Sequence, residues 1–346
     1  MIDFRYHLVS IVAVFLALAI GIVLGATNLR GGTLDLLQTT NDSLKNQLTT
    51  AQAARDGYLN QSSAAEQYLQ SAEPTLLARQ LEGKSLVIVT EPGAQGSVVD
   101  GIKQAATLAG ATVTGEVALQ PKFNDISGAN QSSLSGIDNS IATQDGASLP
   151  TGSNPQTTYQ QQAAQLIATA ILASTTTAIE PTDAQAILSA YAQGGYLTVA
   201  PAGAPTAPAQ LAVIVTPESA PADGQNDPAN QVLLAVAQEF AGASSATLVA
   251  GSALGSAQSG SAMSVLRSSS VSSQVSSVDD ADLTLGQITV VDALANQLAG
   301  KKPNSYGISG ASAVGPSPLP TPTTTSTPTQ AATPHSTTTR KAGAKK

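Results

Sequence analysis

The chain has 346 residues, a net charge of −8 and no cysteine, and only 3% of its residues are aromatic. The absence of cysteine excludes disulfides, thiolate metal sites and cysteine catalysis. An acidic, aromatic-poor chain also argues against nucleic acid as a partner, because it offers neither a basic surface nor stacking platforms for bases.

The first element is an uncharged apolar run at residues 8–27, LVSIVAVFLALAIGIVLGAT. As a helix, a run of this length crosses the roughly 30 Å hydrocarbon core of a bilayer. The alternative is a cleaved signal peptide, but the run is longer than the roughly 7–15 apolar residues of such a signal. The sequence therefore predicts an uncleaved transmembrane anchor in residues 1–30, in which Gly21 and Gly25 form a G-x-x-x-G face that lets a second helix approach.

A seven-residue repeat fits the next segment, residues 33–83. Its a positions are all apolar or aromatic (Leu37, Leu44, Ala51, Tyr58, Ala65 and Ala72), whereas its d positions are mixed (Leu34, Asn41, Leu48, Arg55, Ser62, Leu69 and Leu76). This pattern favours a membrane-proximal coiled coil that pairs two chains, and the alternative is an amphipathic helix lying on its own domain. The residues predicted to mediate self-association, as a homodimer or homo-oligomer, are Gly21, Gly25, Leu37, Leu44, Leu48 and Leu69. Pro74 is expected to start a new short helix through Leu81, which Gly83 stops.

Residues 84–313 have the pattern of an α/β domain. Five apolar runs are expected as strands (85–90, 111–119, 195–200, 211–216 and 245–251), and six stretches are expected as helices (98–110, 159–175, 182–191, 230–240, 262–267 and 282–300). Short apolar strands separated by helical stretches indicate parallel strands covered on both faces, in a doubly wound, Rossmann or flavodoxin-like parallel-sheet domain. Segments 120–157 and 201–228, outside the strand at 211–216, are expected as long surface loops.

Residues 84–313, which we call the body, contain few residues that indicate a catalytic or ligand-binding site. The loop at 91–97 follows the first strand, but it has only G-x-x-G, a proline and no basic residue before Lys103, which favours an ordinary turn over a phosphate site. Asp279, Asp280 and Asp282 could hold a hard cation, but adjacent acids more often mark a solvated loop or a helix N-terminus. Because the two histidines, His7 and His335, lie outside the body, no serine there has a histidine base. We predict no catalytic residue, no cofactor, no bound metal and no enzyme activity.

The last segment, residues 314–346, is rich in Pro, Thr and Ser and has no apolar periodicity. Such a segment buries too little surface to fold, so it is predicted to be disordered. Outside a cell, tracts of this composition are commonly O-glycosylated stalks, and the alternative is an inert solubilising tail.

Three parts of the chain carry a resemblance to a known family. They are the opening MIDFRYHLVSIVAVFLALAIGIVLG, the pair LEGKSLVIVTEPGA and LAGATVTGEVAL, and the closing VSSVDDADLTLGQITVVDALANQLAGKKPNSYG. Together they resemble the actinobacterial envelope family named for mycobacterial copper transport, the MctB-type proteins. The resemblance implies copper efflux or resistance, a pore in the outer membrane, and in some relatives a link to envelope assembly. Relatives often carry a histidine before the closing Tyr-Gly, whereas Ser305 precedes Tyr306 here.

The residues themselves do not favour copper coordination. Cu(I) prefers Cys, Met and His ligands, and the chain has only Met1, Met263, His7 and His335. Copper is therefore expected as a transported ion rather than as a tightly bound ligand. The alternative function is a non-catalytic dimeric scaffold that binds another cell-envelope or division protein. The basic residues on the two sides of the anchor hardly favour either orientation in the membrane. The resemblance and the tail favour a single-pass membrane protein whose α/β domain is extracytoplasmic.

Overall fold

The computed structural model describes residues 4–145, 149–150, 154–173, 180–199 and 207–309, and within the first helix it describes side chains at residues 6–26 and from 36 onwards. The chain divides into two compact units, Met1–Ser71 and Ala72–Lys346. The predicted disordered tail, 314–346, lies outside the described residues, and so does His335.

The first element, α1 (Phe4–Leu77), is one helix of 74 residues that includes both the predicted anchor and most of the predicted coil segment. Its apolar stretch Tyr6–Ala26 is long enough to cross a membrane. The prediction of a separate short helix from Pro74 to Leu81 is wrong, because Pro74 lies inside α1, which ends at Leu77. The buried side chains of Glu73 and Leu77 anchor this last turn in the second unit, so it persists although Pro74 gives no backbone hydrogen bond.

Within the described ranges, the second unit contains one seven-stranded sheet in the order β3-β2-β1-β4-β5-β6-β7. The strands are β1 (Ser85–Thr90), β2 (Thr112–Leu119), β3 (Leu197–Val199), β4 (Leu211–Val215), β5 (Ala246–Ala250), β6 (Ser276–Val278) and β7 (Ser305–Tyr306). All neighbours are parallel except β2 and β3, which pair antiparallel. The central strands β4 and β5 are buried along their whole length, as the strands of a sheet covered on both faces should be. The predicted α/β class with a doubly wound parallel sheet is confirmed.

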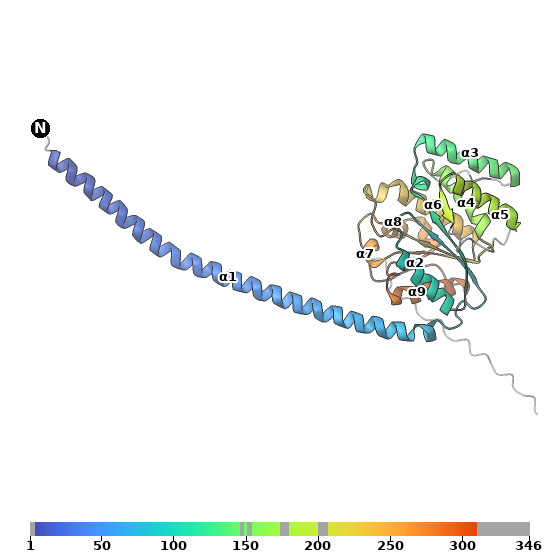
Figure 1. Ribbon diagram of the computed structural model, residues 1–346, viewed down its shortest axis with the longest axis horizontal. Helices are drawn as coiled ribbons and strands as arrows, with labels where there is room; N and C mark the ends of the chain where they lie inside the picture. Colours follow the sequence, from blue (N-terminus) through green and yellow to red (C-terminus); the bar gives the residue numbers. More distant parts are fainter. Residues whose placement is uncertain (1–3, 146–148, 151–153, 174–179, 200–206, 310–346) are drawn as a thin grey trace, which may run out of the picture. The chain divides into compact units, whose positions relative to one another are not determined.

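Helices cover both faces of this sheet (Figure 1). On one face lie α2 (Gly96–Leu108) and α9 (Thr284–Leu298), which pack against each other. On the other lie α4 (Thr158–Ile171), α5 (Pro181–Gln193), α6 (Pro228–Ala243) and α8 (Ala262–Ser268). Val87, Ala212 and Ile214 of the sheet belong to the core cluster beneath this second set of helices.

Two predictions about the body are wrong. The segment 120–157, expected as a loop, contains the short 3-10 helix η1 (Pro121–Asn124) and the helix α3 (Gly128–Asp145). Helix α3 packs on the core cluster through Leu134, Ile137 and Ile141, a sparse apolar stripe among Ser, Asn and Gly residues. A 2.7 Å hydrogen bond that the Tyr191 hydroxyl donates to Asp138 also holds it. The two short strands β6 and β7 were not expected, because Ser276, Ser277 and Ser305 give them no apolar pattern.

Candidate functional site

The order of the strands marks one place where open α/β sheets bind ligands. From β1 the chain passes through α2 to β2 on one side, whereas β4 and β5 lie on the other side of β1. The loops that leave the carboxyl ends of β1 and β4 therefore diverge, and the crevice between them is the topological switch point of the sheet.

A cavity of about 290 Å³ lies there, and we call it the β1–β4 cavity. Its walls come from the loops after β1 and β4, from η1 and from the first turn of α6. The lining residues are Glu91, Pro92, Gly93, Asn124, Pro217, Ser219, Ala220, Pro221, Ala229 and Asn230. Four loops or helix ends thus meet around a space that suits a small ligand, since sites for drug-sized molecules begin at about 300 Å³.

Glu91 is the ionisable group of this cavity. Its backbone N–H donates to Val215 O (2.9 Å) and its carbonyl accepts from Ala94 N–H (3.0 Å), so the main chain is fixed against β4. The side chain is only 5% exposed, and among the described residues its Oε1 atom has no hydrogen-bond partner. Burial disfavours the charged carboxylate and raises the pKa of Glu91 to about 8, so the group is mainly protonated at neutral pH.

Two asparagines and Ser219 are the other polar side chains of the described lining. Asn230 is held in place because its Nδ2 donates to Gly224 O (2.8 Å) and Gly260 O (2.9 Å). Asn124, the last residue of η1, has a buried Oδ1 atom without a partner in the described part of the chain. The cavity therefore presents at least two buried oxygen atoms, from Glu91 and Asn124, that lack a donor within the described ranges.

Sequence reasoning treated the 91–97 loop as an ordinary turn and missed Glu91, Asn124 and Asn230. One signal was present, since Glu91 directly follows the first apolar strand of a fold whose ligands bind beyond the carboxyl ends of the strands. The two asparagines could not have been found, because η1 and the position of the first turn of α6 depend on the tertiary structure.

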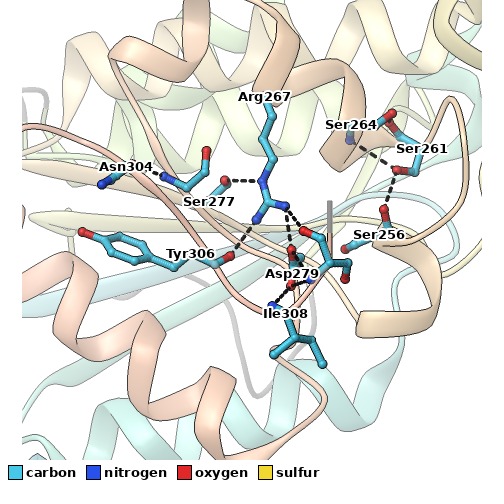
Figure 2. A network of polar contacts seen from close by, with 11 residues as sticks. Ser256, Ser261, Ser264, Arg267, Ser277, Asp279, Asn304, Tyr306 and Ile308 are labelled. Carbon is cyan, nitrogen blue, oxygen red and sulfur yellow. Dashed lines mark hydrogen bonds and ion pairs between the residues drawn. The ribbon is translucent and has the colours of Figure 1, made fainter. Parts of the chain in front are cut away.

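A second polar group, the Arg267 cluster, joins the carboxyl-terminal end of the described chain to the sheet (Figure 2). It consists of Arg267, Ser277, Asp279, Tyr306, Ile308 and Ser309. Arg267 forms a buried ion pair with Asp279 (Nη1 to Oδ2, 2.6 Å) and also donates to the backbone oxygens of Tyr306 (2.6 Å) and Ser309 (2.8 Å). Asp279 in turn accepts from the backbone N–H of Ile308 (2.8 Å) and of Ser309 (3.1 Å).

The expectation that the three neighbouring aspartates cap a helix or lie in a solvated loop is wrong for Asp279 and Asp280, which are buried. Asp282 is exposed and accepts from Ala253 N–H (2.8 Å) at the start of α7 (Ala253–Ser256), so it caps a helix other than the one that follows it. Burial, with the nearby charge of Asp279, raises the pKa of Asp280 to about 6.

Two glycines, Gly286 and Gly307, lie against the buried aspartates. Gly307 has a φ of 123°, and a Cβ atom there would collide with the carboxylate of Asp279. A Cβ at Gly286 would likewise collide with the backbone of Asp280. The two glycines are thus required by close packing around the buried aspartates.

Candidate copper ligands are few in this chain, and two of them, Met1 and His335, lie outside the described residues. No group of three or more His, Cys, Asp or Glu residues that could hold a metal occurs among the residues that the structure describes. Met263 is a residue of α8 and is buried in the core, and His7 lies at the start of the apolar stretch of α1.

The residues predicted to mediate self-association all lie on α1. Gly21 and Gly25 are one turn apart, with open space where a Cβ atom would stand. Leu37, Leu44 and Leu48 are 66%, 59% and 59% exposed, and Leu69 is half-buried. The structure holds a single chain, so pairing through these residues stays a prediction.

Comparisons with known proteins agree with the resemblance. The family model "Copper transport outer membrane protein, MctB" matches residues 1–316. Copper transporter MctB of Mycobacterium bovis is 31% identical over 314 residues, which are 89% of this chain and 96% of that protein, and the Mycobacterium tuberculosis protein gives the same values. Copper transporter MctB of Mycobacterium leprae is 29% identical over 325 residues, 91% of this chain and 99% of that protein. The chain therefore belongs to the MctB family of copper transport outer membrane proteins.

Proposed function

We propose that this chain is a membrane-anchored envelope protein that contributes to copper efflux without catalysing a reaction. The observation that carries the proposal is the family match over residues 1–316, which includes both α1 and the α/β body. The apolar stretch Tyr6–Ala26 supplies the anchor, and the body is proposed to lie on the extracytoplasmic side.

Tight storage of copper is not part of this proposal. The chain has no Cys, two Met and two His, so it lacks the soft ligands with which proteins hold Cu(I). A single spanning helix encloses no channel by itself, so passage of copper would require several copies of α1 around one path. The exposed leucines that follow the span and the G-x-x-x-G face of Gly21 and Gly25 support such an assembly.

The proposal is tested in a strain that lacks this chain. We expect that strain to accumulate copper and to grow poorly in copper-containing medium, and we expect the wild-type gene to restore both. A control gene lacking the apolar stretch should not restore them. Normal copper content and growth without the chain would contradict a role in efflux.

The second candidate function is a dimeric scaffold for another envelope or division protein. It is favoured by the large apolar and aromatic side chains that α1 exposes beyond the span: Leu36, Leu37, Leu44, Leu48, Tyr58, Leu59 and Tyr68. Exposed apolar side chains of this kind are suited to packing against a second helix, which can come from another copy of this chain or from a different protein.

Purified full-length protein in planar bilayers separates the two functions. Discrete conductance that increases with copper would support a pore. The scaffold would be supported by two results together. The bilayers show no conductance, and cysteines placed at Leu44 and Leu48 cross-link the chain to one reproducible partner in intact cells.

A further inference from the structure

We propose that the β1–β4 cavity binds a small molecule that carries a protonated amine, with Glu91 as its counter-ion and Asn124 as a second hydrogen-bond acceptor. This goes beyond the proposed role in copper efflux and does not depend on it.

Two buried oxygen atoms of the cavity have unsatisfied hydrogen-bonding capacity among the described residues. Glu91 Oε1 and Asn124 Oδ1 are buried oxygen atoms without a donor among the described residues, and both residues line the same cavity. Buried polar atoms are normally paired, because an unpaired one loses its hydrogen bonds to water without replacement. An ammonium group has three N–H donors and no acceptor, so it is suited to oxygens that lack a donor.

The charges around Glu91 are mainly negative. The described lining contains no Lys, Arg or His. The titratable groups beside the lining segments are mostly acids: Asp125 after η1, Glu218 in the loop after β4, and Asp223 and Asp227 before α6. The basic side chain in η1, Lys122, is engaged elsewhere, since its Nζ donates to Gly194 O (2.8 Å) and lies 4.5 Å from the centroid of the Tyr196 ring. A cation is therefore favoured over an anion.

Two other ligand classes fit less well. The first turn of α6 could attract an anion, but the Asp227 carboxylate already accepts from Ala229 N–H (2.9 Å) at this position. A hard metal ion such as Ca²⁺ needs about six or more oxygen ligands, whereas Glu91 is the one carboxylate among the described lining residues. An amine needs only the acceptors that the cavity offers.

The proposal has a consequence for pH. The amine binds the ionised carboxylate, so its binding must expel the proton that Glu91 carries below its raised pKa, about 8. The affinity should therefore increase about tenfold for each pH unit below this value and then level off, since an alkylamine stays protonated over this range. A neutral ligand would show no such increase.

The experiment uses the full chain in detergent with two probes of similar shape, n-butylamine and n-butanol. Ligand-detected NMR titrations at pH 6, 7 and 8 give the dissociation constants for the wild type and for three variants. Glu91→Gln is the central variant, because it keeps the shape of the neutral carboxyl group but cannot ionise. Asn124→Leu removes the second acceptor, and Glu218→Gln is the matched control, an acid beside the cavity that does not line it.

We expect n-butylamine to bind the wild type about tenfold more tightly at pH 7 than at pH 6, and n-butanol to bind weakly with no pH dependence. Glu91→Gln should abolish the pH dependence and weaken amine binding at least tenfold at pH 8, Asn124→Leu should weaken it less, and Glu218→Gln should leave it within twofold. Equal binding of both probes, an affinity independent of pH, unchanged amine binding by Glu91→Gln, or no binding of the amine would each overturn the proposal.

Discussion

A protonated carboxyl group in the interior links the stability of the body to pH. In the folded chain Glu91 keeps its proton up to a pKa of about 8, whereas in the unfolded chain it loses it near the ordinary value of 4.5. Between these two values the unfolded chain binds fewer protons, so the free energy of unfolding falls as pH rises. Buried Asp138, Asp280 and Asp292, whose pKa values are raised to about 7, 6 and 6, act in the same direction.

We predict that Glu91→Gln makes the full chain more stable than the wild type at pH 8 and indistinguishable from it near pH 4.5. The gain should grow by about 1 kcal/mol for each pH unit in between, because the amide cannot ionise. Urea unfolding at pH 4.5, 6, 7 and 8 measures it. The same pH slope in both proteins would show that Glu91 is not buried as described.

Asp279 is a different case, a buried carboxylate that forms an ion pair with Arg267. We predict that Asp279→Ala lowers the free energy of unfolding by about 3–5 kcal/mol, since Arg267 would remain buried without its counter-charge. Urea unfolding of the full chain gives this value. Asp282→Ala, three residues away and exposed, is the matched control and should cost about 1 kcal/mol or less by loss of a cap. Equal losses in the two variants would show that the ion pair adds nothing.

At the scale of the elements, the local pattern of apolar residues was enough to predict some helices and strands but not others. Strand β1 and helix α2 were predicted because SLVIVT is apolar throughout and the following helix repeats apolar residues at helical spacing. Helix α3 has only a sparse apolar pattern and is held in part by Tyr191 from another helix. Strand β6 has no apolar pattern and is held by its place between β5 and β7. Interactions of this kind join residues far apart in sequence, so they cannot be read from one segment.

The candidate site, too, could be predicted from the sequence only in part. The place of Glu91 after a buried strand could be read from the sequence, but its burial could not, because the loop after β4 and the first turn of α6 also form the walls. The unbroken course of α1 through Gly31 and Gly32 was also not apparent, since glycine lowers helix propensity by about 1 kcal/mol per residue without forbidding a helix.

For α1, we predict that Gly21→Ile together with Gly25→Ile weakens self-association in a membrane reporter assay at least several-fold. The two side chains would fill the open space on one helix face and force neighbouring backbones apart. Val23→Ile adds bulk on the other side of the same turn and is the control. If the double variant associates as strongly as the control, this face is not the contact.

At the scale of the whole molecule, the family is one of copper transport but the chain is poor in copper ligands. We predict no submicromolar Cu(I) binding by the full chain, because its carboxylates are hard oxygen donors and its soft ligands are few. Titration with Cu(I) against a competing chelator, at a pH where the carboxylates are ionised, measures this. Stoichiometric, tight binding would contradict the prediction and locate ligands that we have not identified.

The Arg267 cluster also decides where the chain can be shortened. It binds the backbone at Tyr306, Ile308 and Ser309, directly before the Pro/Thr-rich segment, so every residue needed to close the sheet precedes that segment. A protein that ends at Ser309 should unfold at the same urea concentration as the full chain. One that ends at Lys302 should unfold at a clearly lower concentration, because it lacks β7 and the three residues that bond to the buried pair. Proteolysis, glycosylation or fusion of a reporter beyond residue 309 can then alter the reach of the molecule while its body stays folded.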